Sequence, residues 1–484
     1  MKKSVLRGLT SKPVIFLSAY LVFLAFSLEV SCQFLRVPQY TFEVGGIGSI
    51  GRQAPFWLVS NNFGKYAAVP VSGFLSAKLN SEIDSSKKIA FAYELEAFGR
   101  LDSESSLYFH QANVRLNIWF MHLRLGSKED TYGNQHGRLS SGSLLWSENT
   151  RPMPKIVLAT NGFVDVPFTK GYGQFSGHFS HGWFGDNGYV KDAYLHHKDV
   201  FVKAGGNLPV NISMGLQHYA VWGGVSPDPA IGALPSDFDA FTRVLFSKKG
   251  EDTIAGIPLN ESLNKIGNHL GSWQYKLDVK LNRYLLGIYY QTIFEDYSGF
   301  SNFFMSDGLW GISLETKDSK KLINAFTYEY IHTTYQSGPP EALNSAKTKG
   351  NDNFFNNSIY KSGWTYNHFT IGTPIISSPS LIEGGAIYIT NNRVIAHHFG
   401  LQGETSNSLA YRMLLTFSRN YGVYDYAIPF PESKPVQSIL LEISKPIQKF
   451  RGLDLLLKVA ADYGELYGNN AGVFIAFRKS GGGK

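Results

Sequence analysis

The clearest feature of the chain is an alternation of apolar and polar residues with a period of two. The run 272–281 shows it best, with Trp273, Tyr275, Leu277, Val279 and Leu281 on one face and Gln274, Lys276, Asp278 and Lys280 on the other. Similar runs occupy 89–97, 111–120, 409–418 and 453–463. Successive side chains of a β-strand point to opposite faces, so each run predicts a strand between an apolar and a polar environment.

A soluble β-sandwich would also alternate, but two further features favour a transmembrane barrel. The runs recur through most of the chain at roughly the ~10-residue length that a tilted membrane-spanning strand needs. Aromatic residues stand at run ends, as in the girdles of outer-membrane barrels, namely at Trp119, Phe120, Trp273, Tyr284, Tyr289, Tyr290 and Tyr463. We therefore predict an all-β fold, a transmembrane antiparallel β-barrel, and a spacing of about 25 residues per strand gives about 18 strands.

The first 32 residues have the pattern of a cleavable export signal. A basic start is followed by an uncharged apolar stretch, and Val30-Ser31-Cys32 resembles a cleavage site. We predict a signal peptide at 1–32 and a barrel at 33–484. In the alternative, a lipoprotein, Cys32 would be lipidated, but Glu29 stands where that signal has an apolar residue. After Gln33 no stretch approaches the ~18 consecutive apolar residues of a membrane helix.

The composition agrees with a chain that faces lipid or hides a large core. Aromatic residues make up 14% and charged residues 17%, against roughly 25% charged residues in soluble domains. The formal net charge of +7 includes four basic groups of the export signal, so nucleic acid is not a predicted partner. Cys32 is the one cysteine, so the rest of the chain has neither a disulfide nor a thiolate metal site.

One segment departs from the strand pattern. Phe238, Phe241, Val244 and Leu245 have helical spacing. Ser236 can cap the start of the helix, and Lys248-Lys249-Gly250 suits its end. We predict a short helix near 236–250 that plugs the lumen or lies at the periplasmic mouth. Long polar connections are expected at 126–155, 223–235 and 336–358.

The sequence offers little support for catalysis, cofactors or metals. Gly46 to Gly51 matches G-x-G-x-x-G, but Gln53-Ala54-Pro55-Phe56-Trp57 is not a helix start, which a dinucleotide site requires, so we interpret the motif as a turn. His178 and His181 would lie on opposite faces of a strand, as would the pairs His196-His197 and His397-His398. Glu94 and Glu96 share a face at ~7 Å, which would suit an inverting glycosidase, but a carboxylate ladder in a barrel lumen is the simpler interpretation.

Sugar binding is the more plausible chemistry, because aromatic rings can stack on sugar faces while neighbouring polar groups bind hydroxyls. The alternative is that these tryptophans belong to the girdle or pack a plug. The candidate carbohydrate-binding residues are grouped around three tryptophans: Trp146 with Glu148, Asn149 and Arg151; Trp183 with Asp186 and Asn187; and Trp222 with Asp228.

Four ordered segments resemble the Wzi family of capsule assembly proteins, in particular its Bacteroidota branch. They are Gln53–Asn62, Ser143–Pro154, Tyr172–Phe179 and Gly215–Gly224, of which Ser143–Pro154 is the most specific. The resemblance spans nearly all of the chain after the signal. It implies an outer-membrane barrel of about 18 strands with periplasmic helical elements and a non-enzymatic, lectin-like role. The strand-like Tyr40–Gly46 leaves no room for the N-terminal helical bundle of better-known members.

Three functional hypotheses follow. The first is a lectin-like barrel that anchors capsular polysaccharide or exopolysaccharide at the surface, with outer-membrane lipid and the polysaccharide export machinery as further partners. The second is an outer-membrane channel for small solutes or saccharides, suggested by the predicted luminal charges Lys276, Asp278 and Lys280. The third is a hydrolase that uses Glu94 and Glu96.

Overall fold

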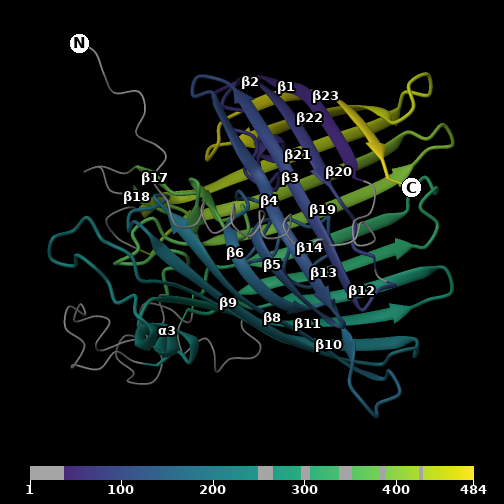
Figure 1. The fold of residues 1–484 in the computed structure, drawn as a ribbon. Coiled ribbons are helices and arrows are strands. Elements are labelled where there is room, and N and C mark those ends of the chain that lie inside the picture. The colour runs from purple at the N-terminus through teal and green to yellow at the C-terminus, as the bar shows by residue number, and fades with distance from the viewer. Residues whose placement is uncertain are drawn as a thin grey trace.

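The chain folds into a closed antiparallel β-barrel (Figure 1). The computed structural model describes residues 38–483 except 85, 249–264, 296–305, 337–351, 382–386 and 425–428. The predicted signal peptide and Cys32 lie outside the described residues. Within the described part the barrel has 18 strands, because the two-residue β7 extends the pairing that β6 makes with β8. The fold class and the strand number are those predicted.

The barrel strands follow one another around the wall in chain order. They are β1 (Gln39–Ile50), β2 (Val71–Asn80), β3 (Ile89–Leu101), β4 (Ser106–Ile118), β5 (Met121–Ser127), β6 (Pro154–Thr160), β7 (Val164–Asp165), β8 (Gly173–Gly185), β9 (Ala193–Ala204), β10 (Val210–Trp222), β11 (Asn268–Lys280), β12 (Tyr284–Gln291), β13 (Gly308–Thr316), β14 (Ala325–His332), β19 (Val394–Glu404), β20 (Ala410–Gly422), β21 (Pro429–Pro446), β22 (Leu453–Gly464) and β23 (Asn470–Gly482).

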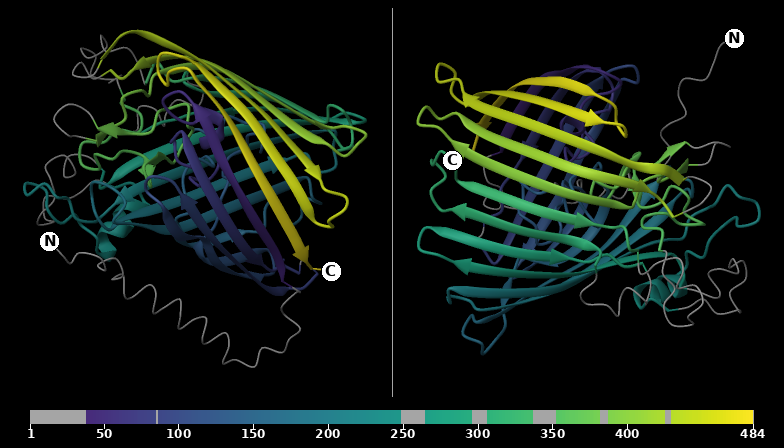
Figure 2. Two further views of the ribbon diagram at one scale, coloured as in Figure 1. Left: turned by 90° about the horizontal axis from the view of Figure 1, so that it is seen from above. Right: turned by 180° about the vertical axis from the view of Figure 1, so that it is seen from behind.

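The two ends of the barrel differ. β1 pairs with β23 from Gln39–Gly482 to Ile50–Ala471, which closes the wall and places both ends of the described chain at one rim. Short turns connect the strands at that rim, which we call the turn end. The long connections gather at the opposite rim, the loop end (Figure 2).

The outer surface carries an apolar belt. Exposed large apolar side chains include Phe42, Val44, Leu75, Leu95, Phe109, Ile212, Ile288, Ile312 and Ile475, and each lies on a strand of the wall. Polar neighbours such as Gln111, Gln274 and Lys458 are buried on the inner side. All five alternating runs lie in strands, which confirms the prediction made from them. Tyr289 is a correction to the predicted girdle: it faces inward, where its hydroxyl donates to Glu329 at 2.7 Å.

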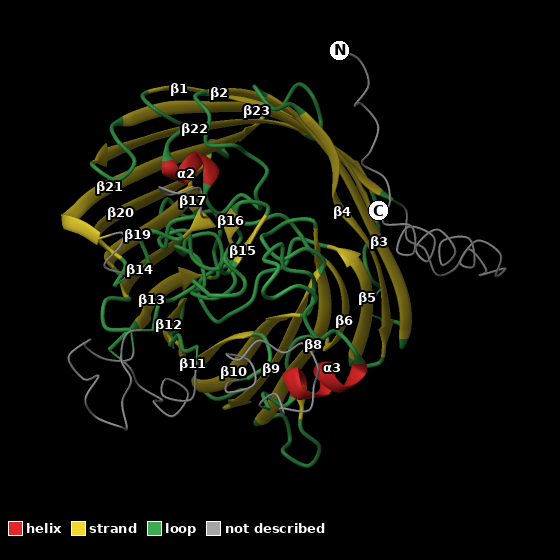
Figure 3. Ribbon diagram, turned by 90° about the vertical axis from the view of Figure 1, so that its left-hand side faces the viewer, coloured by secondary structure: helices red, strands yellow, loops and turns green. Residues whose placement is uncertain are grey.

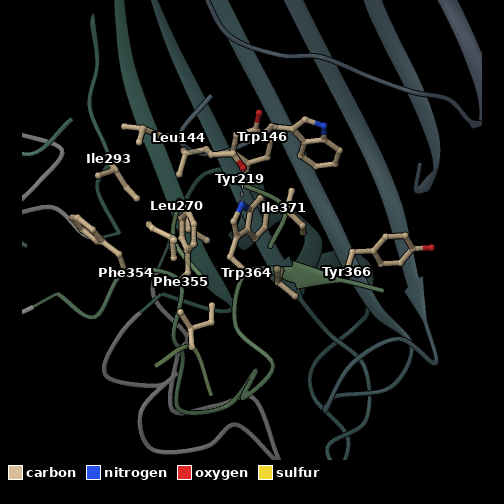
Figure 4. Packing of buried hydrophobic residues seen from close by; sticks show 14 of the residues in the cluster. Leu144, Trp146, Tyr219, Leu270, Ile293, Phe354, Phe355, Trp364, Tyr366 and Ile371 are labelled. Carbon is tan, nitrogen blue, oxygen red and sulfur yellow. Dashed lines mark hydrogen bonds between the residues drawn. The ribbon is translucent and has the colours of Figure 1, made fainter. Parts of the chain in front are cut away.

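Two segments lie inside the lumen and form a plug (Figure 3). The first plug segment, residues 128–153, joins β5 to β6. The second, residues 352–381, belongs to the connection between β14 and β19 and carries β15 (Thr365–Tyr366) and β16 (Phe369–Thr370). A further small pairing joins β17 (Ser380–Leu381) to β18 (Ile387–Tyr388). Leu144, Trp146, Phe355 and Trp364 of the plug form one buried core with Tyr219 of the wall (Figure 4).

Two short helices interrupt the all-β pattern. α2 (Phe56–Val59) is a single turn after Pro55, and it lies inside the barrel against β21 and β22. The prediction that no helix starts after Gln53 was therefore wrong, because Pro suits the start of a helical turn. The glycine motif before it lies in β1 and ends at Gly51, rather than forming a turn throughout. No helix of the described residues is long and apolar enough to span a membrane.

The second helix, α3 (Phe238–Leu245), confirms the predicted helix but not its position. Asp237, not Ser236, caps it by accepting a hydrogen bond from Ala240 N at 2.8 Å, and Lys249-Gly250 lies outside the described residues. The helix lies on the outer wall at the loop end, not in the lumen (Figure 3). Its apolar face packs on the outward-facing Ala220 and Trp222 of β10, which the helical spacing could not reveal.

Candidate functional site

The nine residues predicted to bind carbohydrate lie in four separate places. Trp146, Asn149 and Arg151 belong to the plug; Glu148 borders a pocket in the lumen; Trp183 and Trp222 lie on the outer wall near α3; and Asp186, Asn187 and Asp228 lie in loop-end connections. The structure therefore does not bring all nine to one site.

The plug residues make structural contacts. Trp146 is 4% exposed and stacks on Tyr219 with ring centroids 5.8 Å apart, while Lys155 Nζ lies 4.3 Å from its ring centroid. Asn149 is buried and joins the two plug segments by donating to Thr370 O at 3.1 Å. Arg151 stacks over the Tyr108 ring at 3.8 Å. In this conformation these residues pack the plug.

The two outer-wall tryptophans differ in cover, since Trp222 is buried under α3 and Trp183 is partly exposed. Trp222 is 3% exposed, and its ring lies 5.7 Å from that of Phe241 on the helix. Trp183 packs against His181, with ring centroids 5.0 Å apart. Because His181 and Trp183 share the outward face of β8, neither side chain points into the lumen.

The loop-end cluster consists of Tyr189, Asp228 and Lys361, of which Asp228 was predicted, and the predicted Asp186 lies in the same connection as Tyr189. Asp186 and Tyr189 lie between β8 and β9, Asp228 follows β10, and Lys361 belongs to the second plug segment. Lys361 Nζ lies 3.8 Å from Asp228 Oδ2 and 4.9 Å from the Tyr189 ring centroid. The Tyr189 backbone N donates to Ser362 Oγ at 2.7 Å, which fastens the two connections together. Asn187 lies in the same turn and donates to Phe184 O.

The loop-end cluster is open to solvent and suits a sugar. The side chains of Lys361 and Asp228 are 40% and 33% exposed, and Asp186 is exposed. An aromatic face can pack on the apolar side of a sugar ring. Carboxylates accept from sugar hydroxyls, and an ammonium donates to them. The cluster therefore combines the groups needed to hold a saccharide chain.

Sequence reasoning missed Tyr189 and Lys361. Tyr189 is two residues after the predicted Asn187, so extending the search along that loop would have found it. Lys361 had no such signal, because it lies far along the chain from Asp228 and only the fold brings them together.

The plug is attached to the wall on two sides. Asp130 Oδ2 lies 2.7 Å from both Arg124 of β5 and Lys155 of β6. On the opposite side, Glu329 of β14 accepts from Ser140 Oγ at 2.6 Å and Ser141 N at 2.7 Å. These are charge-assisted contacts between buried groups, so they hold the plug in one position.

The carboxylates of the hydrolase hypothesis are both engaged in ion pairs. Glu94 lies 2.5 Å from Lys78 and Lys128. Glu96 lies 3.0 Å from Lys65 and also accepts from Gln111 at 2.7 Å. They share the inner face of β3, as predicted, and the ion pairs support the carboxylate-ladder interpretation.

One group of three metal-ligand side chains occurs in the described part of the chain, formed by Glu96, His110 and Glu129. The pairing of β3 with β4 has a bulge, because Glu96 pairs with Gln111 and Ala97 with Phe109, so His110 has no partner on β3. Lys65 lies 2.8 Å from Glu129, so its ammonium already supplies positive charge there. Burial raises the pKa of Glu129, but the hydrogen bond with His110 and the charge of Lys65 outweigh it and lower the pKa to about 2.

The adjacent histidines and the predicted luminal charges contact neighbouring residues of the protein. His196 faces α3 while His197 stacks on Tyr219 inside the barrel, which confirms that adjacent histidines point apart. Lys276 lies 3.5 Å from Asp278. Lys280, at the turn end, donates to Gly206 O at 2.7 Å.

Comparisons with known proteins identify relatives. The family described as capsule assembly protein Wzi matches residues 45–382, which is more than half of the chain. No curated protein matches. The solved structures that resemble the fold include the Escherichia coli outer-membrane protein Wzi, described as a carbohydrate-binding β-barrel involved in group 1 capsule assembly, at 15% identity and a TM-score of 0.56, covering 95% of this chain and 88% of that one.

A second similar structure is OccK5 (OpdH) of Pseudomonas aeruginosa, at 8% identity and a TM-score of 0.48, covering 93% of this chain and 99% of that one. At 15% identity the Escherichia coli structure bears on the fold alone. The family match over residues 45–382 carries the assignment, and it includes the segments 53–62, 143–154, 172–179 and 215–224 that carried the resemblance. The chain therefore belongs to the Wzi family of capsule assembly proteins.

Proposed function

We propose that this barrel binds capsular polysaccharide or exopolysaccharide and anchors it at the cell surface without chemically changing it. Membership of the capsule assembly family supports a role in building the capsule. The observation that carries the proposal is the loop-end cluster, in which Tyr189, Asp228 and Lys361 meet on exposed connections.

The orientation follows from the barrel architecture. Outer-membrane barrels have short periplasmic turns and longer extracellular loops, so the loop end would face the outside of the cell. The apolar belt would contact outer-membrane lipid, and the loop-end cluster would face the polysaccharide. The turn end would face the periplasm, where the export machinery is a further candidate partner.

The plug favours an anchor over a channel. It lies inside the lumen and is fastened to β5–β6 on one side and to β14 on the other. The ion pairs of Glu94 and Glu96 support a non-enzymatic role, because neither carboxylate is free to act as acid or base.

Deleting the gene tests the proposal. An anchor acts after synthesis, so cells without it should make the same total polysaccharide but release most of it into the medium. Quantifying cell-bound and free polysaccharide after centrifugation measures this, with the wild-type gene on a plasmid as control. Unchanged proportions would refute the anchoring role, and shortened glycan chains in wild-type cells alone would indicate a hydrolase.

A further inference from the structure

Two arginines lie beside each other on the outer wall at the loop end, on the neighbouring strands β19 and β20 (Figure 1). Arg419 of β20 is exposed and shares the outward face of the strand with Phe417. Arg393 immediately precedes β19 and continues its pairing, because its N donates to Gly422 O at 3.0 Å and its O accepts from Tyr421 N at 2.8 Å. Arg393 is therefore opposite Tyr421 and diagonal to Arg419, which places the two arginine Cβ atoms roughly 7 Å apart.

Both arginines stand at the loop-end edge of the apolar belt. Arg393 has the same parity as His397, which is exposed on the outer face of β19, whereas Val394 is fully buried on the inner face. Arg419 follows the exposed Phe417 by two residues, about 7 Å along the strand. An arginine on the lipid face is costly at the centre of a bilayer but not near its interfaces. The two side chains therefore suit the level of the lipid headgroups.

Neither guanidinium forms an ion pair with the described residues. Arg393 donates through Nε to Thr334 O at 3.5 Å, and its two terminal nitrogens are open to solvent without a described partner. Its Cζ lies 3.7 Å from the Tyr424 ring centroid, and the Tyr424 hydroxyl donates to the same Thr334 O at 2.7 Å. The ring and the shared carbonyl hold the guanidinium in place, so its free nitrogens are preorganised for an anion.

The carboxylate of Asp307, which precedes β13 at the same rim, is already engaged. It lies 2.7 Å from His332 Nδ1 and accepts from Tyr335 N at 3.0 Å. Two like charges on one face of adjacent strands repel each other. An anion from outside the chain that contacts both Arg393 and Arg419 would remove this repulsion.

We propose that Arg393 and Arg419, the outer arginine pair, bind the phosphate of a lipid headgroup in the outer leaflet of the membrane. The choice of leaflet rests on the proposed function, in which the loop end faces the outside of the cell. A guanidinium presents paired N–H donors that match phosphate oxygens, and clusters of basic residues at a membrane surface attract anionic headgroups. Lipid is favoured over polysaccharide because both side chains face away from the lumen and border the apolar belt.

The experiment titrates the full chain in neutral detergent micelles with fluorescent diphosphoryl lipid A and with the same lipid after removal of its phosphates. The wild type should bind the phosphorylated lipid at least tenfold more tightly. Combining Arg393→Ala with Arg419→Ala should abolish this preference, because one charged hydrogen bond is worth about tenfold or more. Arg283→Ala, at an exposed arginine of a turn-end connection, removes the same charge elsewhere and should keep the preference.

Heat-modifiable migration on gels verifies folding. Arg393→Gln with Arg419→Gln keeps nearly the same side-chain length and replaces the alanine variant if that variant does not fold. Equal affinity of the wild type for the two lipids would overturn the proposal, and so would an equal loss of preference in Arg283→Ala. If the double variant lost binding of polyglucuronate but kept its preference for the phosphorylated lipid, the outer arginine pair would belong to the polysaccharide instead.

The lipid site and the polysaccharide anchor can fail separately. Lys361→Ala should weaken binding of the purified polysaccharide while leaving the preference for phosphorylated lipid unchanged, because the loop-end cluster lies beside β8 to β10 and the outer arginine pair on β19 and β20. A normal lipid preference in a protein whose deletion does not release polysaccharide would refute the anchor but not the lipid site.

Discussion

At the scale of residues, a side chain suited to sugar binding is useful only where the fold exposes it. Trp146 has the right chemistry, but it is 4% exposed and stacked on Tyr219. Lys361 is 40% exposed on a loop-end connection, and the partly exposed Tyr189 lies beside it. The binding and packing roles of aromatic residues can therefore be separated by substitution.

Replacing Lys361 with alanine tests the loop-end cluster. The change removes the ammonium beside Asp228 and the Tyr189 ring, so polysaccharide binding should weaken roughly 5- to 10-fold, the scale of a cation–π contact with a weak ion pair. Surface binding to immobilised polysaccharide measures it. Lys317→Ala, exposed at the turn end, is the control, and equal affinity of the two variants would count against the cluster.

Trp146→Ala should act on stability. Removing a buried tryptophan from the plug core should cost about 3–5 kcal/mol, and denaturation of the detergent-solubilised barrel followed by circular dichroism would detect it. Trp119→Ala, at a residue that is 69% exposed in a turn, should leave stability nearly unchanged. Normal stability of Trp146→Ala with lost polysaccharide binding would show instead that Trp146 contacts the sugar.

At the scale of elements, α3 protects a part of the wall that does not suit lipid. His181, His196 and Trp222 face outward on β8 to β10, and Phe241 of the helix contacts all three rings. Lys198 donates to Leu245 O at the end of the helix. The helix therefore covers outward-facing polar groups of β8 to β10.

Val244→Asp should detach α3. Val244 is fully buried against the wall, and a carboxylate there would have no partner, which costs several kcal/mol. Hydrogen exchange of residues 238–245 should rise to that of an exposed loop. Phe238→Asp introduces the same charge at a residue that is 78% exposed and should leave exchange unchanged. Equal protection in both variants would mean that packing does not hold the helix.

At the scale of the whole molecule, the barrel and its plug form one unit. The wall alone would leave a wide lumen, since barrels of 16–18 strands normally enclose an aqueous channel. Here Glu329 of the wall accepts a hydrogen bond from Ser140 of the plug, and Asp130 of the plug pairs with Lys155 of the wall. The plug therefore determines whether the barrel conducts.

Planar-bilayer recording tests this. The wild type should be nearly silent, whereas Glu329→Ala leaves the hydroxyls of Ser140, Ser141 and Tyr289 without their acceptor and should produce frequent channel openings. Glu465→Ala, at an exposed position in a loop-end connection, should remain silent. Large steady conductance of the wild type would favour the channel hypothesis instead.

The sequence by itself determined the wall. Alternation of apolar and polar residues is a local property of a strand, so runs such as 272–281 predicted both the strands and their two faces, and length predicted their number. The same local logic placed His196 and His197 on opposite faces. The hypothesis of a role in capsule assembly came from the family resemblance of four segments, because neither residue spacing nor composition indicates such a role.

Tertiary structure alone decided what fills and covers the wall. The helical spacing of Phe238 to Leu245 predicted α3 but not which side of the wall it would cover, because an apolar stripe does not specify its partner. A tyrosine such as Tyr289 suits both the outer girdle and the lumen, and the inward position follows from its hydrogen bond to Glu329. Lys361 meets Asp228, and Arg412 meets Glu442, only through contacts between distant segments. The sequence therefore named Asp228 of the loop-end cluster but not the lysine that lies beside it.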